Sequence, residues 1–126
     1  MSVKKIFIII FLYINAIAFA QNELHKKVAD IFMKDFNNSD FEQIYQTFSP
    51  EMKELRTKEH HLAFLAKVKK SQGNLLFLEL SDYLENSGKT RGNYNGSFQF
   101  GNAFIRITNN PKGEIIGLYI KKNTLL

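Results

Sequence analysis

The chain of 126 residues contains no cysteine. This absence excludes disulfide bonds, cysteine-ligated metal sites and a lipid attached to a cysteine. Small secreted animal domains usually depend on disulfides, so an exported chain without them fits a bacterial periplasmic or secreted protein better. The sequence also contains neither a Gly-x-Ser-x-Gly motif nor a glycine-rich phosphate loop between a strand and a helix. It therefore lacks the signatures of the common serine hydrolases and nucleotide-binding enzymes.

No apolar run is long enough to be a typical membrane span. The longest, residues 6–19, follows the basic start at residues 1–5 and ends with small residues at Ala18 and Ala20. This order is typical of a secretory signal peptide, so we expect cleavage after Ala20 and one domain over residues 21–126. The alternative is a membrane anchor, but the run is shorter than the roughly 20 apolar residues that span a bilayer. We therefore expect a periplasmic or secreted protein that is not a lipoprotein and has no stable membrane span after cleavage.

Positive charge is in small excess. The formal net charge is +5, and loss of Lys4 and Lys5 leaves 15 basic against 12 acidic residues, or +3. The densest basic run, residues 67–70, falls at a predicted helix end, where cations stabilise the helix dipole. We expect no nucleic-acid binding. Neighbouring residues on a helix, such as His60 and His61, do not face each other, so we also expect no metal and no cofactor.

The first half of the domain has helical periodicity. Apolar residues recur at helical spacing over residues 23–36 and predict a first helix. Ser39 and Glu42 form a capping-box pattern for a second helix. The residues expected to face inward from these two helices are Leu24, Val28, Ile31, Phe32 and Phe36, and then Phe41, Ile44, Tyr45 and Phe48.

Two further helices are predicted by their end signals. Ser49 is a favourable N-cap and Pro50 suits the first helical position, where no amide hydrogen is needed, so a short helix begins there and runs through Leu55. Thr57 can cap a longer helix through Gln72, which Gly73 ends. Leu62, Leu65 and Val68 are expected to point inward from it.

From Leu75 the apolar period changes to two, which predicts strands over residues 75–85, 90–100, 103–109 and 114–121. Turns at residues 86–88, 101–102 and 110–113 give a register with one apolar face. The residues expected on this face are Leu76, Leu78, Leu80, Leu84, Tyr94, Phe98, Phe100, Ala103, Ile105, Ile107, Ile116, Leu118 and Ile120. The predicted class is α+β, with N-terminal helices on one face of a four-stranded antiparallel meander.

Three stretches carry a family resemblance: "DFEQIYQTFSPEMKE", "LAFLAKVKKSQGNL" and "GSFQFGNAFIRITNNPKGEIIGLYIKK". Their order and turns resemble the NTF2-like superfamily (cystatin-like α+β fold), and more closely its DUF3887 group of exported bacterial domains. The resemblance covers residues 24–122. Members of this group often precede a serine hydrolase or β-lactamase-like domain, and the resemblance implies that the activity of such a domain is absent from residues 21–126. Some NTF2-like relatives instead isomerise or hydrate small molecules with an inward carboxylate, and these domains commonly associate through the sheet face.

The predicted register places one carboxylate, Asp82, on the apolar face, where burial raises a carboxyl pKa and makes it a candidate base. The alternative is that Asp82 lies near the strand end and reaches water. Tyr45 and Tyr94 are candidates to line the same ligand cavity, although tyrosines are often core residues with a solvated hydroxyl.

The opposite, outer face carries an aromatic edge around an arginine. The predicted register puts Leu75, Gln99, Phe104 and Tyr119 in one cross-strand row and Phe77, Ser97, Arg106 and Gly117 in the next. Aromatic residues with arginine are enriched at interfaces. The candidate partner-binding residues are Leu75, Phe77, Phe104, Arg106 and Tyr119, and the alternative is ordinary exposed apolar surface.

The leading hypothesis is an exported, non-enzymatic binding module of NTF2-like type. Its partner would be an unknown exported protein, a second copy in a homodimer through the outer sheet face, or a small apolar ligand. The alternative is a small cavity enzyme of isomerase or hydratase type with Asp82 as base.

Overall fold

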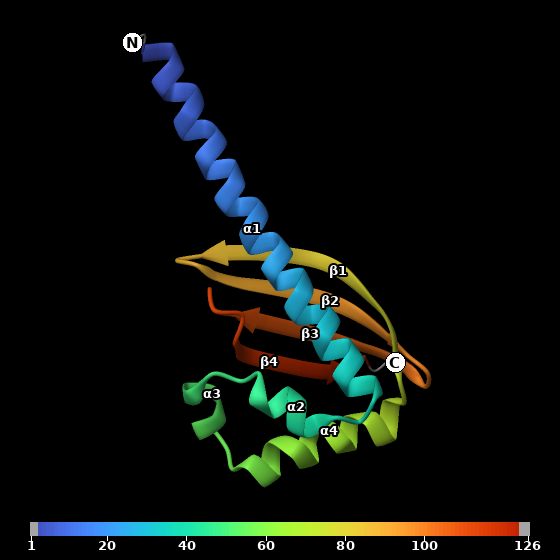
Figure 1. The fold of residues 1–126 in the computed structure, drawn as a ribbon. Coiled ribbons are helices and arrows are strands. Elements are labelled where there is room, and N and C mark those ends of the chain that lie inside the picture. Colours follow the sequence, from blue (N-terminus) through green and yellow to red (C-terminus); the bar gives the residue numbers. More distant parts are fainter. Residues whose placement is uncertain (1–2, 124–126) are drawn as a thin grey trace.

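The computed structural model describes the backbone of residues 3–123 and the side chains from residue 20 onward. Four helices precede four strands, so the predicted α+β class is confirmed (Figure 1). The strands pair antiparallel in the order β1-β2-β3-β4. The elements are α1 Val3–Asn37, α2 Phe41–Gln46, α3 Pro50–Glu54, α4 Lys58–Gln72, β1 Leu75–Asn86, β2 Lys89–Phe98, β3 Gly101–Asn109 and β4 Ile115–Lys122.

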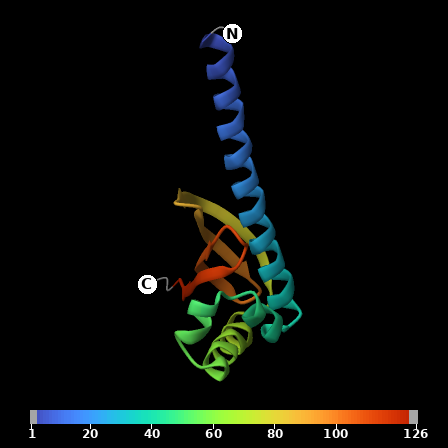
Figure 2. The same cartoon turned by 60° about the vertical axis from the view of Figure 1, so that its left-hand side comes forward.

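The helices divide into two groups around the sheet. Figures 1 and 2 show α1 crossing one face of the sheet, with its first half running beyond the strands, while α2, α3 and α4 gather beside β4. No helix of the described residues has the length and apolar character needed to cross a bilayer. As a result of this arrangement around the sheet, α3, α4 and β4 meet on the side of the sheet that β4 forms (Figure 1).

The core lies between α1 and the inner face of the sheet. Ile31, predicted to point inward, is 39% exposed, and the buried residues of α1 are His25, Val28, Ala29, Phe32, Asp35 and Phe36. Burying each large apolar side chain stabilises the fold by roughly 1.5–3 kcal/mol. The other buried apolar residues are Ile44, Phe48, Met52, Leu65, Leu75, Tyr94, Phe98, Ala103, Ile105, Ile107 and Ile115.

The predicted capping box at Ser39 is wrong. Ser39 has a left-handed φ of 56°, its amide bonds to Phe36 O, and the Asp40 amide bonds to Asp35 O. This is the pattern of a Schellman motif, so Ser39 ends α1 and cannot cap the next helix. Asp40 caps α2 instead, by accepting a hydrogen bond from the Gln43 amide.

The predicted caps of α3 and α4 are confirmed, whereas the first helix begins at Val3 and not at residue 23 as predicted. Ser49 caps α3 with Pro50 in its first turn, and Thr57 caps α4 by accepting from the His60 amide. Gly73, with φ 78°, ends α4. Lys69 of α4 donates from Nζ to Phe36 O and Asn37 O at 3.0 and 2.7 Å, which ties α4 to the negative end of α1.

The β2–β3 hairpin turns two residues earlier than predicted. Phe98 pairs with Gly101, so the loop is Gln99–Phe100 rather than Gly101–Asn102. Side chains of a strand alternate between the two faces, so a shift of two residues leaves each one on the same face. The inward-facing residues of β2 and β3 therefore keep their predicted side. Phe100 is the exception, because it lies in the loop and is 68% exposed.

Two irregularities in β1 change which residues face inward. The first, between Leu75 and Phe77, puts Leu75 into the core opposite Phe98 and leaves Leu76 exposed. The second, between Leu80 and Asp82, reverses the alternation after Ser81. Asp82 consequently pairs with Asn93 on the outer face, and the predicted placement of this carboxylate on the apolar face is wrong.

The same reversal moves two other residues. Leu84 pairs with the outer-face residue Arg91, contrary to prediction, and Tyr83 turns inward to meet His25 with ring centroids 5.5 Å apart. A further shift between β3 and β4 brings Ile115 into the core in place of Ile116. Leu118 and Ile120 pack against the core as predicted.

Candidate functional site

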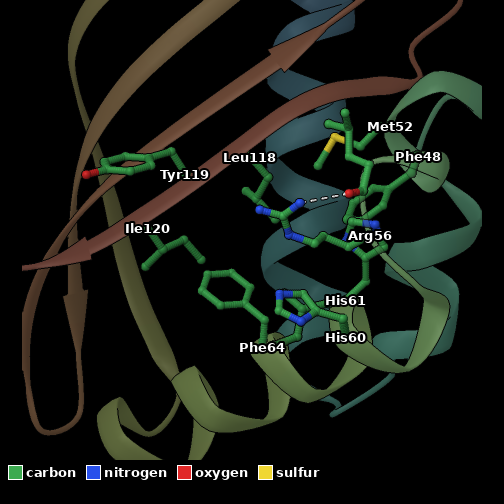
Figure 3. A pocket seen from close by; sticks show the side chains of 11 residues that line it. Phe48, Met52, Arg56, His60, His61, Phe64, Leu118, Tyr119 and Ile120 are labelled. Carbon is green, nitrogen blue, oxygen red and sulfur yellow. Dashed lines mark hydrogen bonds between the residues drawn. The ribbon is translucent and has the colours of Figure 1, made fainter.

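The main cavity lies between α3, α4 and β4 and has a volume of about 420 Å³ (Figure 3). This is within the size range of small-molecule sites, which are usually concave and mostly apolar. Three of its apolar walls remain substantially exposed: Leu55 at 65%, Phe64 at 38% and Tyr119 at 51%. The lining residues are Phe48, Met52, Leu55, Arg56, His60, His61, Phe64, Leu65, Leu118, Tyr119 and Ile120.

The corner at Ser49–Pro50 creates this cavity. The Ser49 amide donates to Ile115 O at 3.0 Å and the Ile115 amide donates to Thr47 O at 2.9 Å, so Phe48 forms a short parallel bridge to the edge of β4. The chain then turns into α3, whose buried Met52 faces the cavity. Because α3 and α4 are separated by the cap at Thr57, the two helices and β4 surround a space that no described side chain fills.

The polar side chains that line the cavity are those of Arg56, His60, His61 and Tyr119. Arg56 donates from a terminal guanidinium nitrogen to Leu55 O at 3.0 Å (Figure 3). His61 packs edge-on against Phe48 with ring centroids 5.3 Å apart, and its Nε2 atom is buried without a hydrogen-bond partner in the described residues. Among the described residues, no carboxylate lines the cavity. The site can therefore hold an apolar body together with a hydrogen-bonding or negatively charged group.

A second groove of about 240 Å³ continues along α4. It shares Phe64 and Ile120 with the main cavity, so the two spaces adjoin on either side of these side chains. Its other lining residues are Lys67, Val68, Ser71, Gln72, Ala103 and Lys122. Gln72 is only 3% exposed, and its Oε1 is buried without a partner in the described part of the chain.

The three residues predicted to share a ligand cavity are separated. Tyr45 lies on α2, where its ring contacts Phe48 and His61. The ammonium groups of Lys53 and Lys58 lie 5.2 and 5.4 Å from the centroid of this ring, as cation–π contacts. Asp82 is exposed on the outer face and accepts a 3.4 Å hydrogen bond from Asn93. Tyr94 lies under α1 in a buried polar cluster.

This buried polar cluster consists of His25, Thr90, Tyr94 and Asn109. The Asn109 amide nitrogen donates to Asn110 O, so its Oδ1 faces His25 and accepts from Nδ1–H at 2.7 Å and from the Thr90 hydroxyl at 2.7 Å. His25 Nε2 then accepts from the Tyr94 hydroxyl at 2.7 Å. This arrangement places a proton on Nδ1, and the lowered pKa of His25 favours the neutral imidazole, in which Nε2 is the acceptor.

Burial governs the protonation of this cluster. Desolvation lowers the pKa of His25, and the hydrogen bond that His25 donates to Asn109 only partly opposes this shift. Burial also raises the pKa of Tyr94 to about 12 and raises that of Tyr83. The sequence reading missed His25 as a core residue, and the one local sign was its place in the stripe with Val28, Ala29 and Phe32.

The buried carboxylate of Asp35 on α1 was not predicted from the sequence. One of its oxygens has no hydrogen-bond partner among the described residues. The adjacent cavity, between α1, α2 and Ile115, has a volume of only about 50 Å³. It has no room for a substrate. Within residues 3–123, no group of three or more His, Cys, Asp or Glu residues is placed to hold a metal ion.

On the outer face, the structure assembles part of the predicted aromatic patch. Phe104 and Tyr119 meet edge-on with centroids 6.1 Å apart, and the Arg106 guanidinium lies 5.5 Å from the Phe104 centroid. Arg106 also donates from Nε to Asn93 Oδ1 at 2.8 Å. Phe77 is exposed but lies in the row of Ser97 and not of Arg106. Leu75 is 1% exposed, so its predicted place on this surface is wrong.

The chain was compared with protein-family models, curated proteins and solved structures. No family model matches it, and neither a curated protein nor a solved structure does. The architecture is α+β with an open antiparallel sheet, and the NTF2-like resemblance rests on the three sequence stretches alone. The function has to be inferred from the cavity, the buried cluster and the outer face.

Proposed function

We propose that the chain is an exported, non-enzymatic binding module of NTF2-like type that holds an apolar group between α3, α4 and β4. The observation that carries this proposal is the 420 Å³ cavity with exposed apolar walls. Exposed apolar surface gathered around a concavity is typical of binding sites, because its burial by a ligand is favourable. Arg56 and His61 supply the few polar groups that orient a ligand in such a site.

The enzymatic alternative lacks the carboxylate on which it depended. An isomerase or hydratase of the expected kind requires a base inside the apolar cavity, whereas Asp82 is exposed and bonded to Asn93. In the part of the chain that the structure describes, neither of the two α4–β4 cavities is lined by a carboxylate. These placements favour binding without chemistry.

The test is titration of the protein with N-phenyl-1-naphthylamine, a neutral apolar dye that fluoresces on leaving water. The protein is expressed from Met1 and its mature N-terminus is read by mass spectrometry, with loss of residues 1–20 expected. We expect saturable binding to the wild type and at least tenfold weaker binding to Phe64→Glu, because a carboxylate at this wall must be desolvated.

Two control variants accompany Phe64→Glu. Leu84→Glu places the same charge on an exposed outer-face leucine, and Asp82→Asn removes the carboxylate of the enzymatic alternative. Both are expected to bind the dye like the wild type. Equal binding by Phe64→Glu, with its folding verified by circular dichroism, would place the dye elsewhere and reject the proposed site.

A second candidate function is self-association through the outer sheet face. The contact of Phe104 with Tyr119 and Arg106 favours it, because such clusters are enriched at interfaces. Light scattering after size exclusion compares the wild type with Phe104→Glu. A wild type that is dimeric and a Phe104→Glu variant that is monomeric would support this interface. A monomeric wild type would reject self-association.

A further inference from the structure

The β4 strand has an open backbone edge beside the main cavity. In antiparallel pairing, alternate residues direct their N–H and C=O groups to opposite sides of the strand. The Asn123 amide donates to Asn102 O of β3 at 3.0 Å. Leu118, Ile120 and Lys122 therefore direct their backbone groups away from β3, where residues 3–123 offer no backbone partner. This edge can accept one more strand.

The cavity lies against this edge rather than against one face of the sheet. Leu118, Tyr119 and Ile120 are consecutive, so their side chains alternate between the two faces, yet all three line the cavity. Phe64 of α4 forms the opposite wall (Figure 3). The space between an open strand edge and a helix has the form of a groove that takes a single extended chain.

The protein already uses the first part of this edge for strand pairing. The segment around Phe48 forms its parallel bridge at Ile115, immediately before the open part begins. The second groove then extends the space beyond Ile120 to Lys122. An added strand would therefore continue a pairing that the fold itself makes, with pockets for side chains along its length.

The charges of the groove favour an acidic occupant. Arg56, Lys67 and Lys122 line the two adjoining spaces, and no carboxylate of residues 20–123 does. Within the described residues the ion pair is that of Lys58 with Glu42, so Arg56 has no carboxylate partner there. Its guanidinium N–H groups that do not bond Leu55 O can bind a carboxylate. His61 and Gln72, one lining each space, each carry a buried side-chain atom without a hydrogen-bond partner in the described residues.

We propose that the site binds an extended segment of a partner protein by strand addition to β4. Apolar side chains at every second position enter the two pockets, and acidic side chains face Arg56 and Lys122. The inference rests on the proposed function, since it requires that the cavity take an apolar group. β1, the other edge of the sheet, is less suited because it carries Glu79, Asp82 and Glu85 and two register shifts.

The experiment is fluorescence anisotropy with a fluorescein-labelled octapeptide that alternates valine and glutamate. We expect saturable binding, at least tenfold weaker binding of the matching valine–lysine peptide, and at least fivefold weaker binding by Arg56→Gln. Lys89→Gln, which removes one positive charge beside the β1–β2 turn, is the matched control and is expected to bind like the wild type. Phe64→Glu is expected to abolish peptide binding.

Backbone pairing is tested by two N-methylated forms of the acidic peptide, one methylated at its valines and the other at its glutamates. The N–H groups of a strand alternate in direction, so one form is expected to lose binding and the other to retain it. Equal binding of both forms overturns strand addition.

The remaining outcomes identify a different occupant. Displacement of the neutral dye by laurate, with no peptide binding, makes the ligand a lipid carboxylate. Self-association that Phe64→Glu removes makes it a second copy, and tighter dye binding after truncation at Asn123 makes it this chain's own C-terminus; each result overturns the proposal. Dye binding without peptide binding rejects only strand addition, whereas loss of both also rejects the proposed function.

Discussion

The buried cluster around His25 and the cavity around His61 contrast within one small domain. Both ring nitrogens of His25 are within 2.7 Å of partners, which are Asn109 and Tyr94. His61 instead has a buried Nε2 without a partner in the described residues and lies beside exposed apolar walls. One region is closed and satisfied, and the other is open and unsatisfied.

The difference separates a structural histidine from a candidate ligand-binding one. A buried polar group without a hydrogen bond costs free energy, so a fold retains one mainly where a ligand, water or function satisfies it. The His25 cluster joins α1 to β2 and β3, and although Thr90 and Asn109 line a pocket of about 220 Å³, His25 itself stays buried outside that lining. The His61 region has space, an unpaired polar atom and apolar surface together, and these three features are the basis on which we propose the binding role for it.

The largest expected effect comes from His25→Phe. The substitution leaves the Tyr94 hydroxyl buried without its acceptor and forces a larger ring against Gly92, where an added Cβ would already meet His25 Nε2. One unpaired buried group and overpacking together give a loss of about 3–5 kcal/mol in the free energy of unfolding. Urea denaturation measures this. A loss below about 1 kcal/mol would contradict the structural role of His25.

The pH dependence of stability is the next largest effect. The pKa of His25 is lowered in the folded state from its usual 6.5, so below that pH the unfolded chain binds a proton that the folded chain does not. The contribution of His25 to the free energy of unfolding is therefore fully present above pH 6.5, and it is lost as the pH falls from 6.5 toward the lowered pKa. The groups facing His25 are Thr90, Asn109, Tyr83 and Tyr94, and the two tyrosines stay neutral in this range.

Thermal melts at pH 7.5 and pH 5 measure this effect. The wild type is expected to lose more of its Tm on acidification than His25→Phe does, because the variant has no imidazole at this position. His60→Gln, which changes an exposed imidazole, serves as the matched control and should follow the wild type. Parallel losses in wild type and His25→Phe would show that His25 does not titrate with folding.

Local signals in the sequence predicted much of the fold but not the sites. Ser49, Thr57 and Gly73 set helix ends through their nearest neighbours, and all three are confirmed. The loop at Gln99–Phe100 and the shift before Asp82 depend on pairing between strands, which no local pattern specifies. The partners of His25 lie 69 and 84 residues away, so its role could not be read from helical spacing.

The smallest expected effect is that of His61→Phe, and it sharpens the comparison most. Phenylalanine keeps the ring contact with Phe48 and removes a buried nitrogen that has no partner among the described residues. Removing an unsatisfied polar group while keeping its shape is neutral or stabilising, so the free energy of unfolding should stay within about 1 kcal/mol of the wild type or rise. The same substitution that unfolds one histidine site would then be tolerated at the other. Urea denaturation of both variants side by side checks this, and a loss at His61 as large as that at His25 would mean that Nε2 has a stabilising partner in solution, such as a bound water. In that case the cavity would be satisfied without a ligand, and the distinction between the two regions would no longer hold.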